Sequence, residues 1–119
     1  MIDDGRPIFL QIAEQIENDI IQGTYPAESQ VPSTNEFAAF HRINPATAGK
    51  GVNRLVDEGI LYKKRGIGMF VAAGAREHLI AKRSEGFRHE YVQPLVTEAA
   101  KLGIGADQLI DMIRKDMKQ

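Results

Sequence analysis

The spacing of apolar residues predicts a helix near the start of the chain. Five apolar residues repeat at the helical interval, namely Phe9, Ile12, Ala13, Ile16 and Ile20. Pro7 suits the first helical position, where no amide hydrogen bond is required, and Gly23 follows the stripe and ends the helix. The next stretch, TYPAESQVP, has a proline near each end, which predicts a loop over residues 24–32.

Two shorter helices are predicted next, and each begins at a residue suited to a helix N-terminus. Ser33 is followed three residues later by Glu36, the arrangement of a capping box. We expect a short apolar face on this helix, formed by Phe37, Ala38 and Phe40. Asn44 and Pro45 suit the N-cap and first position of a third helix, which we expect to end near Gly59.

The third helix has two distinct faces when its residues are placed about 100° apart. The side expected to pack inward carries Ala48, Val52, Leu55 and Val56. The opposite side carries Ala46, Lys50, Asn53 and Asp57, flanked by Thr47 and Arg54. Small, polar and cationic side chains on the first turns are what a helix needs to enter the major groove of DNA. Gly49 and Gly51 weaken the helix, and they either allow close backbone approach or are simply tolerated.

A β-hairpin follows the third helix. The apolar segments ILYKK and MFVAA flank a turn with Gly66 and Gly68, and Lys63, Lys64 and Arg65 stand directly before that turn. Three short helices and a hairpin in this order predict a winged helix-turn-helix fold, mainly α with a small β-hairpin. In this fold the hairpin is the wing, and its basic tip would meet a phosphate backbone or a minor groove.

The tail after Gly74 is helical again, with a kink or an interruption expected at Pro94 and an end at Gly103. We expect a winged-helix domain over residues 1–74 and a two-helix region over residues 75–119. The tail carries more apolar surface than two helices can bury on themselves, which predicts a homodimer. The residues expected to form the dimer contact are Phe87, Tyr91, Leu95, Leu109, Ile110, Ile113 and Met117.

Charge is unevenly distributed along the 119 residues. Residues 1–40 carry one Lys/Arg and seven Asp/Glu (net −6), residues 41–65 carry six and two (net +4), and residues 66–119 carry eight and seven (net +1). The formal net charge of −1 argues against nucleic acid, but phosphate binding needs only a local basic face. Clusters of this size are also common on solvated surfaces.

Composition argues against several classes of site. The chain has no cysteine, which excludes disulfides and thiolate zinc sites. Its three histidines stand in no catalytic or zinc motif and no phosphate-binding loop is present, so we expect neither an enzyme nor a cofactor. Glu85 and His89 have the spacing to share a metal ion, although an ion pair on the helix surface is the favoured interpretation. The N-terminus is acidic and no apolar run is long enough to span a membrane, so we expect a cytoplasmic protein without a membrane partner.

The segment from Pro7 to Val71 resembles the N-terminal DNA-binding domain of GntR-type bacterial transcription regulators. Its most specific pieces are VPSTNEFA, INPAT and RGIGMFV, and the tail, with KLGIGADQLIDMI, is similar to that of the YtrA subfamily. Glycine is usual in the family's loop near the position of Glu28. The resemblance implies a DNA-binding regulator, and a repressor is expected. The candidate contacts to double-stranded DNA are Ser33, Asn35, Arg42, Asn44, Thr47, Lys50, Arg54, Lys64, Arg65, Gly66 and Gly68.

Two interpretations of the tail and of the whole chain stay open. A small-molecule effector lodged between the tails, or near Pro94, would change the spacing of the DNA-binding domains, and its candidate contacts are Arg88, His89 and Tyr91. These residues equally suit an ordinary surface, with a tail that only dimerises. The alternative function is a winged-helix module that binds other proteins and no specific DNA.

Overall fold

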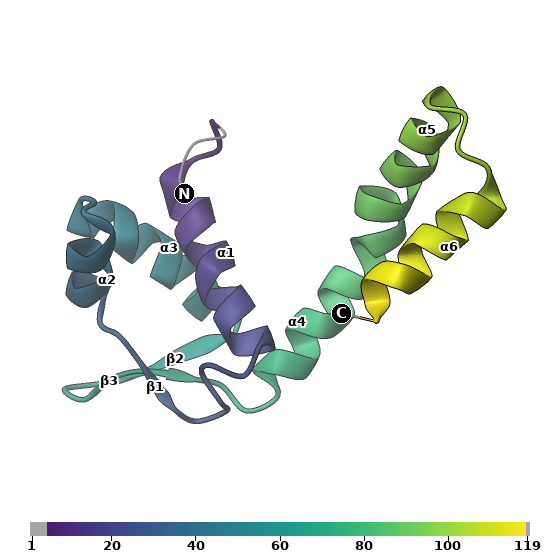
Figure 1. Cartoon of the computed structure of the whole chain (residues 1–119). Coiled ribbons are helices and arrows are strands. Elements are labelled where there is room, and N and C mark those ends of the chain that lie inside the picture. Colours follow the sequence, from purple (N-terminus) through teal and green to yellow (C-terminus); the bar gives the residue numbers. More distant parts are fainter. Residues whose placement is uncertain (1–4, 119) are drawn as a thin grey trace. The chain divides into compact units, whose positions relative to one another are not determined.

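The computed structural model describes residues 5–118 (Figure 1). Their elements, in chain order, are α1 (Ile8–Ile21), β1 (Gln30–Val31), α2 (Thr34–His41), α3 (Pro45–Asp57), β2 (Leu61–Lys64), β3 (Gly68–Val71), α4 (Ala75–Phe87), a π-helical turn (Arg88–Val92), α5 (Gln93–Lys101) and α6 (Ala106–Met117). They form two compact units, and the boundary between them in the sequence falls between Ile80 and Ala81.

Helix α1 forms one wall of the core of the first unit. Its buried residues are Ile12, Ala13, Ile16 and Ile20, as the apolar stripe predicts. The helix begins one residue later than expected, because Pro7 is its N-cap and accepts the amides of Leu10 and Gln11 through its carbonyl oxygen. Gly23, with φ of +89°, follows the last turn, in keeping with the predicted end of the helix.

Helices α2 and α3 begin at the predicted caps. The Ser33 hydroxyl accepts the Glu36 amide at 3.1 Å and the Glu36 carboxylate accepts the Ser33 amide at 2.7 Å, which completes the capping box. Asn44 Oδ1 accepts the amide of Ala46 at 2.7 Å. The predicted apolar face of α2 is wrong at one position: Phe37 and Ala38 are buried, but Phe40 is 81% exposed.

The hairpin is part of a three-stranded antiparallel sheet in the order β1-β3-β2. The sequence predicted β2 and β3 but assigned Gln30 and Val31 to a loop. These two residues pair with Phe70 and Met69 of β3, and Val31 is buried. A strand of two residues is too short to show the period-2 pattern that identifies strands in a sequence.

Close packing of α1 on α3 depends on Gly51. A Cβ atom at Gly51 would lie 2.7 Å from the carbonyl oxygen of Phe9 and 3.3 Å from Ile12, whereas a Cβ at Gly49 would meet only Thr34 Cγ2 at 3.5 Å. Of the two alternatives for this glycine pair, close backbone approach therefore holds for Gly51 and tolerance for Gly49.

The chain from α4 to α5 stays helical through the π turn that precedes Pro94. Proline lacks the backbone N–H that donates a normal helical hydrogen bond. The wider π turn directly before Pro94 accommodates the missing hydrogen bond. Gly103, with φ of +71°, ends α5 as expected. In this second unit Ala99 is buried and Leu109 is half-buried, while most other apolar side chains are exposed.

Candidate nucleic-acid interface

The two faces of α3 are those that the sequence predicts. Ala48, Val52 and Leu55 are buried against the first unit's core, and Val56 is half-buried. The opposite side is exposed at Ala46, Lys50, Asn53, Arg54 and Asp57, and Thr47 is half-buried beside it. The exposed side is therefore available to a partner along the length of the helix.

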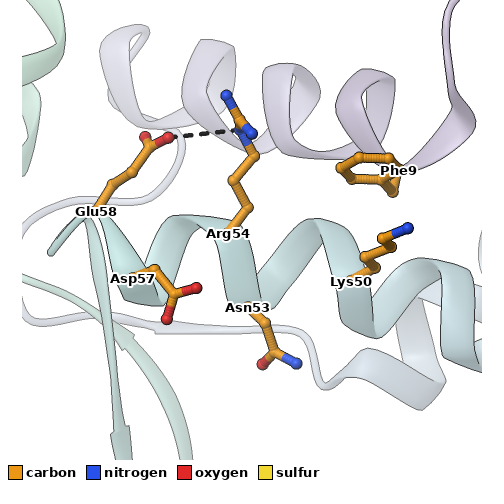
Figure 2. A pocket seen from close by; sticks show the side chains of 6 residues that line it. All are labelled: Phe9, Lys50, Asn53, Arg54, Asp57 and Glu58. Carbon is orange, nitrogen blue, oxygen red and sulfur yellow. Dashed lines mark ion pairs between the residues drawn. The ribbon is translucent and has the colours of Figure 1, made fainter.

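Two of the cations predicted to contact DNA have partners within the chain (Figure 2). Lys50 Nζ lies 4.5 Å from the centre of the Phe9 ring on α1, a cation–π contact. Arg54 Nε lies 3.4 Å from Glu58 Oε2, one helical turn further on. These residues line a hollow of about 390 Å³ together with Asn53 and Asp57. The ammonium group of Lys50 is thus positioned by α1, and the charge of Arg54 is partly compensated.

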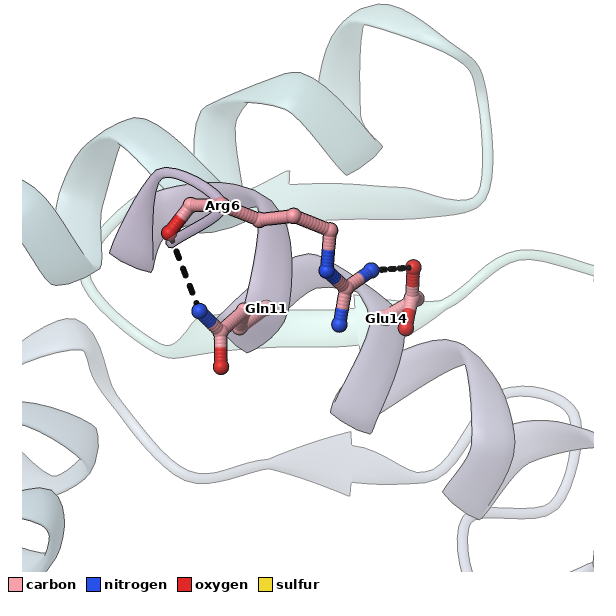
Figure 3. Close-up of polar contacts among 3 residues, drawn as sticks. All are labelled: Arg6, Gln11 and Glu14. Atoms are coloured by element: carbon pink, nitrogen blue, oxygen red, sulfur yellow. Dashed lines mark hydrogen bonds and ion pairs between the residues drawn. The ribbon is translucent and has the colours of Figure 1, made fainter. Parts of the chain in front are cut away.

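Arg6, the one cation of the acidic first third of the chain, is also paired. Its Nη1 atom lies 2.6 Å from Glu14 Oε2, and its carbonyl oxygen accepts the Gln11 side-chain amide at 3.0 Å (Figure 3). These contacts fasten the segment before α1 onto the helix itself. Arg6 therefore adds no unpaired positive charge near α3.

A second groove, of about 360 Å³, lies between the N-terminus of α2, α3 and the wing. It brings together predicted contacts that are far apart in the sequence, because its lining includes Ser33, Asn35 and Gly68. Asn53 of α3 and Lys63 of β2 also face it. The groove gives these polar side chains one common surface.

The wing presents its cations in two different ways. Lys64 Nζ lies 4.4 Å from the centre of the Phe70 ring and 5.9 Å from that of Tyr62, so it is drawn back onto the strands. The side chain of Arg65 is exposed and makes no hydrogen bond or ion pair within residues 5–118. Gly66 and Gly68 form the turn with φ of +77° and +148°, values that suit glycine. Arg65 is therefore available to a partner at the tip itself.

Two non-glycine residues of the first unit have left-handed backbone conformations. Arg42, with φ of +56°, forms the turn between α2 and α3 and is exposed. Glu28, with φ of +66°, stands where the family resemblance led us to expect glycine. The Tyr62 hydroxyl donates to Glu28 Oε1, and this hydrogen bond raises the pKa of Tyr62 above its ordinary value of 10.0, with lesser contributions from burial and from the Glu28 charge.

Three of the contacts that shape this surface were not predicted from the sequence. They are Phe9 with Lys50, Glu28 with Tyr62, and Gln30 with the wing tip. Each joins residues at least 34 positions apart, so no local pattern could reveal them. The sequence offered one related signal, since Glu28 stands where the family resemblance led us to expect glycine, but this signal does not identify Tyr62 as its partner.

The candidate effector contacts Arg88, His89 and Tyr91 all lie in the π turn and are exposed. His89 Nδ1 lies 3.0 Å from Gln93 Oε1, and the rings of Tyr91 and Phe87 are 5.4 Å apart. Within the described part of the chain, no three His, Cys, Asp or Glu side chains cluster as metal ligands would. Over residues 5–118, none of the helices combines the length and the apolar character that crossing a membrane requires.

Comparison with known proteins shows which family the chain belongs to. The family described as "Bacterial regulatory proteins, gntR family" matches residues 9–71. The repressor YtrA of Bacillus subtilis is 27% identical over 109 residues, which cover 92% of this chain and 83% of YtrA. These relatives are transcription regulators, not enzymes.

Solved structures agree with the sequence matches. A GntR-family regulator from Listeria monocytogenes is 28% identical with a TM-score of 0.74, over 96% of this chain and 98% of the other. The DNA-binding domain of AraR, solved in complex with its operator ORX1, is 33% identical with a TM-score of 0.54, over 56% of this chain and 80% of the other. The chain belongs to the GntR family of DNA-binding transcription regulators and is similar to YtrA.

Proposed function

We propose that the protein is a transcription repressor that binds a palindromic DNA operator as a homodimer. Helix α3 would enter the major groove, and the wing tip would meet the flanking backbone or minor groove. Because its partner is chromosomal DNA, the proposal places the protein in the cytoplasm. The relative YtrA is named as a repressor, which supports this direction of control.

One observation carries the proposal: α3 and the basic wing tip present their polar side chains on the same compact unit. Ala46 and Lys50 are exposed on the N-terminal half of α3. The groove lined by Val52, Asn53 and Val56 of its second half extends to Gly68 at the wing. The positive charge of residues 41–65, net +4, is concentrated on these elements. A surface with this charge suits a phosphate backbone, whereas the acidic N-terminal third does not.

The residues divide into two roles. We assign base reading to Thr47 and Lys50, near the start of α3, because the first turns of such a helix reach the base edges. Arg54, further along and paired with Glu58, would anchor a phosphate. The N-termini of α2 and α3, at Ser33 and Asn44, would also bind phosphates, since helix N-termini favour anions. Asn35, Arg42, Lys64, Arg65, Gly66 and Gly68 complete the proposed interface.

The tail completes the proposal through dimerisation. Phe87, Tyr91, Leu95, Ile110, Ile113 and Met117 are exposed, and Leu109 is half-buried. A second tail would cover this apolar surface, and a twofold dimer would place two α3 helices in major grooves about 34 Å apart. The same proposal assigns a small-molecule effector to the π turn at Arg88, His89 and Tyr91, because π turns are frequent at functional sites.

Selection of bound fragments from random DNA tests the proposed function. The wild-type chain should select a palindromic motif. Thr47→Ala and Lys50→Ala should each relax or change it, because a lost base contact typically costs about 1–3 kcal/mol. Gln15→Ala, at an exposed position of α1, is the matched control and should return the wild-type motif. An unchanged motif in both α3 variants would refute the assignment of base reading to this face.

The rival function, a winged-helix module for protein contacts, predicts a different result in a simpler experiment. Binding to nonspecific DNA or heparin should weaken steeply with added salt if the surface neutralises phosphates, because bound counterions are released. A protein-interaction module would lack that dependence. The basic α3 and wing favour DNA.

A further inference from the structure

The wing tip is tied to a strand that precedes it by more than thirty residues. Gln30 lies on β1 and pairs with Phe70 of β3. Its side-chain Nε2 donates to the carbonyl oxygen of Ile67, at the tip, at 3.1 Å. The hairpin's own turn contributes a second bond, from the Ile67 amide to the Lys64 carbonyl at 2.9 Å. Ile67 is thus held from two sides.

The glycine at position 68 is matched to this arrangement. A Cβ atom at Gly68 would overlap the side-chain amide of Gln30, and the φ of +148° is itself unfavourable for other residues. The side chain of Gln30 therefore crosses the face of Gly68 where any other residue would place its side chain. The hydrogen bond and the open glycine are two separate observations of the same close approach.

Holding the tip matters because the tip positions Arg65. Two glycines in one turn lose much conformational freedom when the turn is ordered, so an unrestrained tip would sample many positions. Lys64 is held back on Phe70, and Arg65 has no intramolecular partner among residues 5–118, so its placement follows the turn. A turn ordered before binding spares the complex that entropy cost.

We infer that Gln30 is a positioning residue of the wing, which holds the tip so that Arg65 is presented to DNA beside the groove at α2 and α3. This inference rests on the proposed function. Gln30 lines that same groove with Ser33 and Asn35, so the tie lies between the wing and the start of α2. We expect the hydrogen bond between Gln30 and Ile67 to have a modest effect on DNA affinity, because it is exposed to water.

The test combines Gln30→Met, which keeps the side-chain length and removes the N–H donor, with Arg65→Ala. Fluorescence anisotropy with the selected operator, over a range of salt concentrations, gives the affinity and the salt slope of each single variant and of the double variant. We expect Gln30→Met to weaken binding roughly two- to tenfold, the range for one lost hydrogen bond. Arg65→Ala should then cost much less in the Gln30→Met background than in the wild type. Gln15→Met is the matched control.

A second readout separates positioning from simple contact. In the DNA-free protein, ¹⁵N relaxation of the amides at residues 66–68 should show a more mobile tip in Gln30→Met, with the core amides unchanged. A weaker complex without this change in the free protein would mean that Gln30 touches DNA itself, and would overturn the positioning role. The positioning role would also be overturned if the loss of affinity in the double variant equalled the product of the losses in the two single variants.

Failure of the inference and failure of the proposed function give different results. If Arg65→Ala weakens binding but Gln30→Met leaves affinity and salt slope at wild-type values, the inference falls and the proposed function stands. If the wild-type chain shows no salt-dependent binding to DNA at all, the proposed function falls and the inference falls with it.

Discussion

At the scale of single residues, alanine substitutions at Gly49 and Gly51 of α3 should change the stability of the fold in opposite directions. Alanine at Gly51 would place Cβ 2.7 Å from a backbone oxygen of α1, which forces α1 and α3 apart. We expect Gly51→Ala to destabilise the fold by about 1–2 kcal/mol, because overpacking costs outweigh the gain in helix propensity. Gly49→Ala meets only a side-chain methyl at ordinary contact distance and should stabilise by up to about 1 kcal/mol.

Urea unfolding followed by circular dichroism measures both changes, and each glycine variant is the control for the other. Equal effects of the two substitutions would contradict the assignment of close approach to Gly51 alone.

Arg42 holds the turn between α2 and α3 in a left-handed conformation, with φ of +56°. This conformation costs a non-glycine residue roughly 1–2 kcal/mol, and glycine avoids it while losing somewhat more entropy on folding. We therefore expect Arg42→Gly to raise the free energy of unfolding by up to about 1 kcal/mol. Arg42→Ala removes the same side chain but keeps the strain, so its stability should stay near that of the wild type. An equal rise in the free energy of unfolding in both variants would mean that the loss of the Arg42 charge, and not the relief of backbone strain, causes the effect.

Tyr62 gives the fold a dependence on alkaline pH. Its hydrogen bond to Glu28 raises its pKa in the folded state above the ordinary 10.0, so the protonated phenol is favoured by folding. The resulting stability is fully present below pH 10.0 and is lost as pH rises through the raised pKa. The advantage of the wild type over Tyr62→Phe in urea unfolding should therefore shrink above that pH. An advantage that is constant from pH 8 to pH 11 would show that the hydroxyl has no such role.

At the scale of elements, two cations of the wing that belong to the proposed interface differ, because Lys64 also packs on Phe70 of β3 and Arg65 does not. Arg65→Ala should weaken binding to all DNA sequences alike and reduce the salt slope by about one, the value for one lost phosphate contact. Lys64→Ala should also lower stability, because it removes the ammonium group packed on Phe70. Salt titrations by anisotropy and urea unfolding of both variants check this difference. A normal slope in Arg65→Ala, with a folded protein, would remove the tip from the interface.

The helices and the hairpin could be predicted because their signals are local. The Ser33 and Asn44 caps, the apolar stripe of α1 and the glycines that end the helices act within a few residues. Strand β1 and the contacts of Lys50, Tyr62 and Gln30 could not be predicted, since each depends on a partner from another element. Phe40 was misassigned because the short α2 does not fix which of its apolar residues faces inward.

The same division applies to the candidate interface. The polar face of α3 and the basic tip could be predicted as surfaces, but the partners of the cations could not. Lys50 and Arg54 therefore enter the interface with intramolecular contacts that DNA must replace or share, whereas Arg65 does not.

At the scale of the whole molecule, the exposed apolar residues of the tail predict a dimer. Ile113→Glu places a charge on α6, at a side chain that is 40% exposed and that we assign to the dimer contact. It should shift the protein to a monomer in multi-angle light scattering at micromolar concentration and weaken operator binding. Ser84→Glu, at an exposed polar position of α4, is the matched control and should stay dimeric. A wild-type chain that is monomeric under these conditions would contradict the proposed assembly.

The stoichiometry of the complex decides whether a homodimer binds a palindromic operator, and it is obtained by titrating the selected operator with the full chain at DNA concentrations far above the dissociation constant. We expect saturation at two protomers for each palindromic operator. We also expect much weaker binding to a DNA of the same length and composition in which one half-site is scrambled. Saturation at one protomer, or equal binding to the operator and to fully scrambled DNA, would contradict the proposed function.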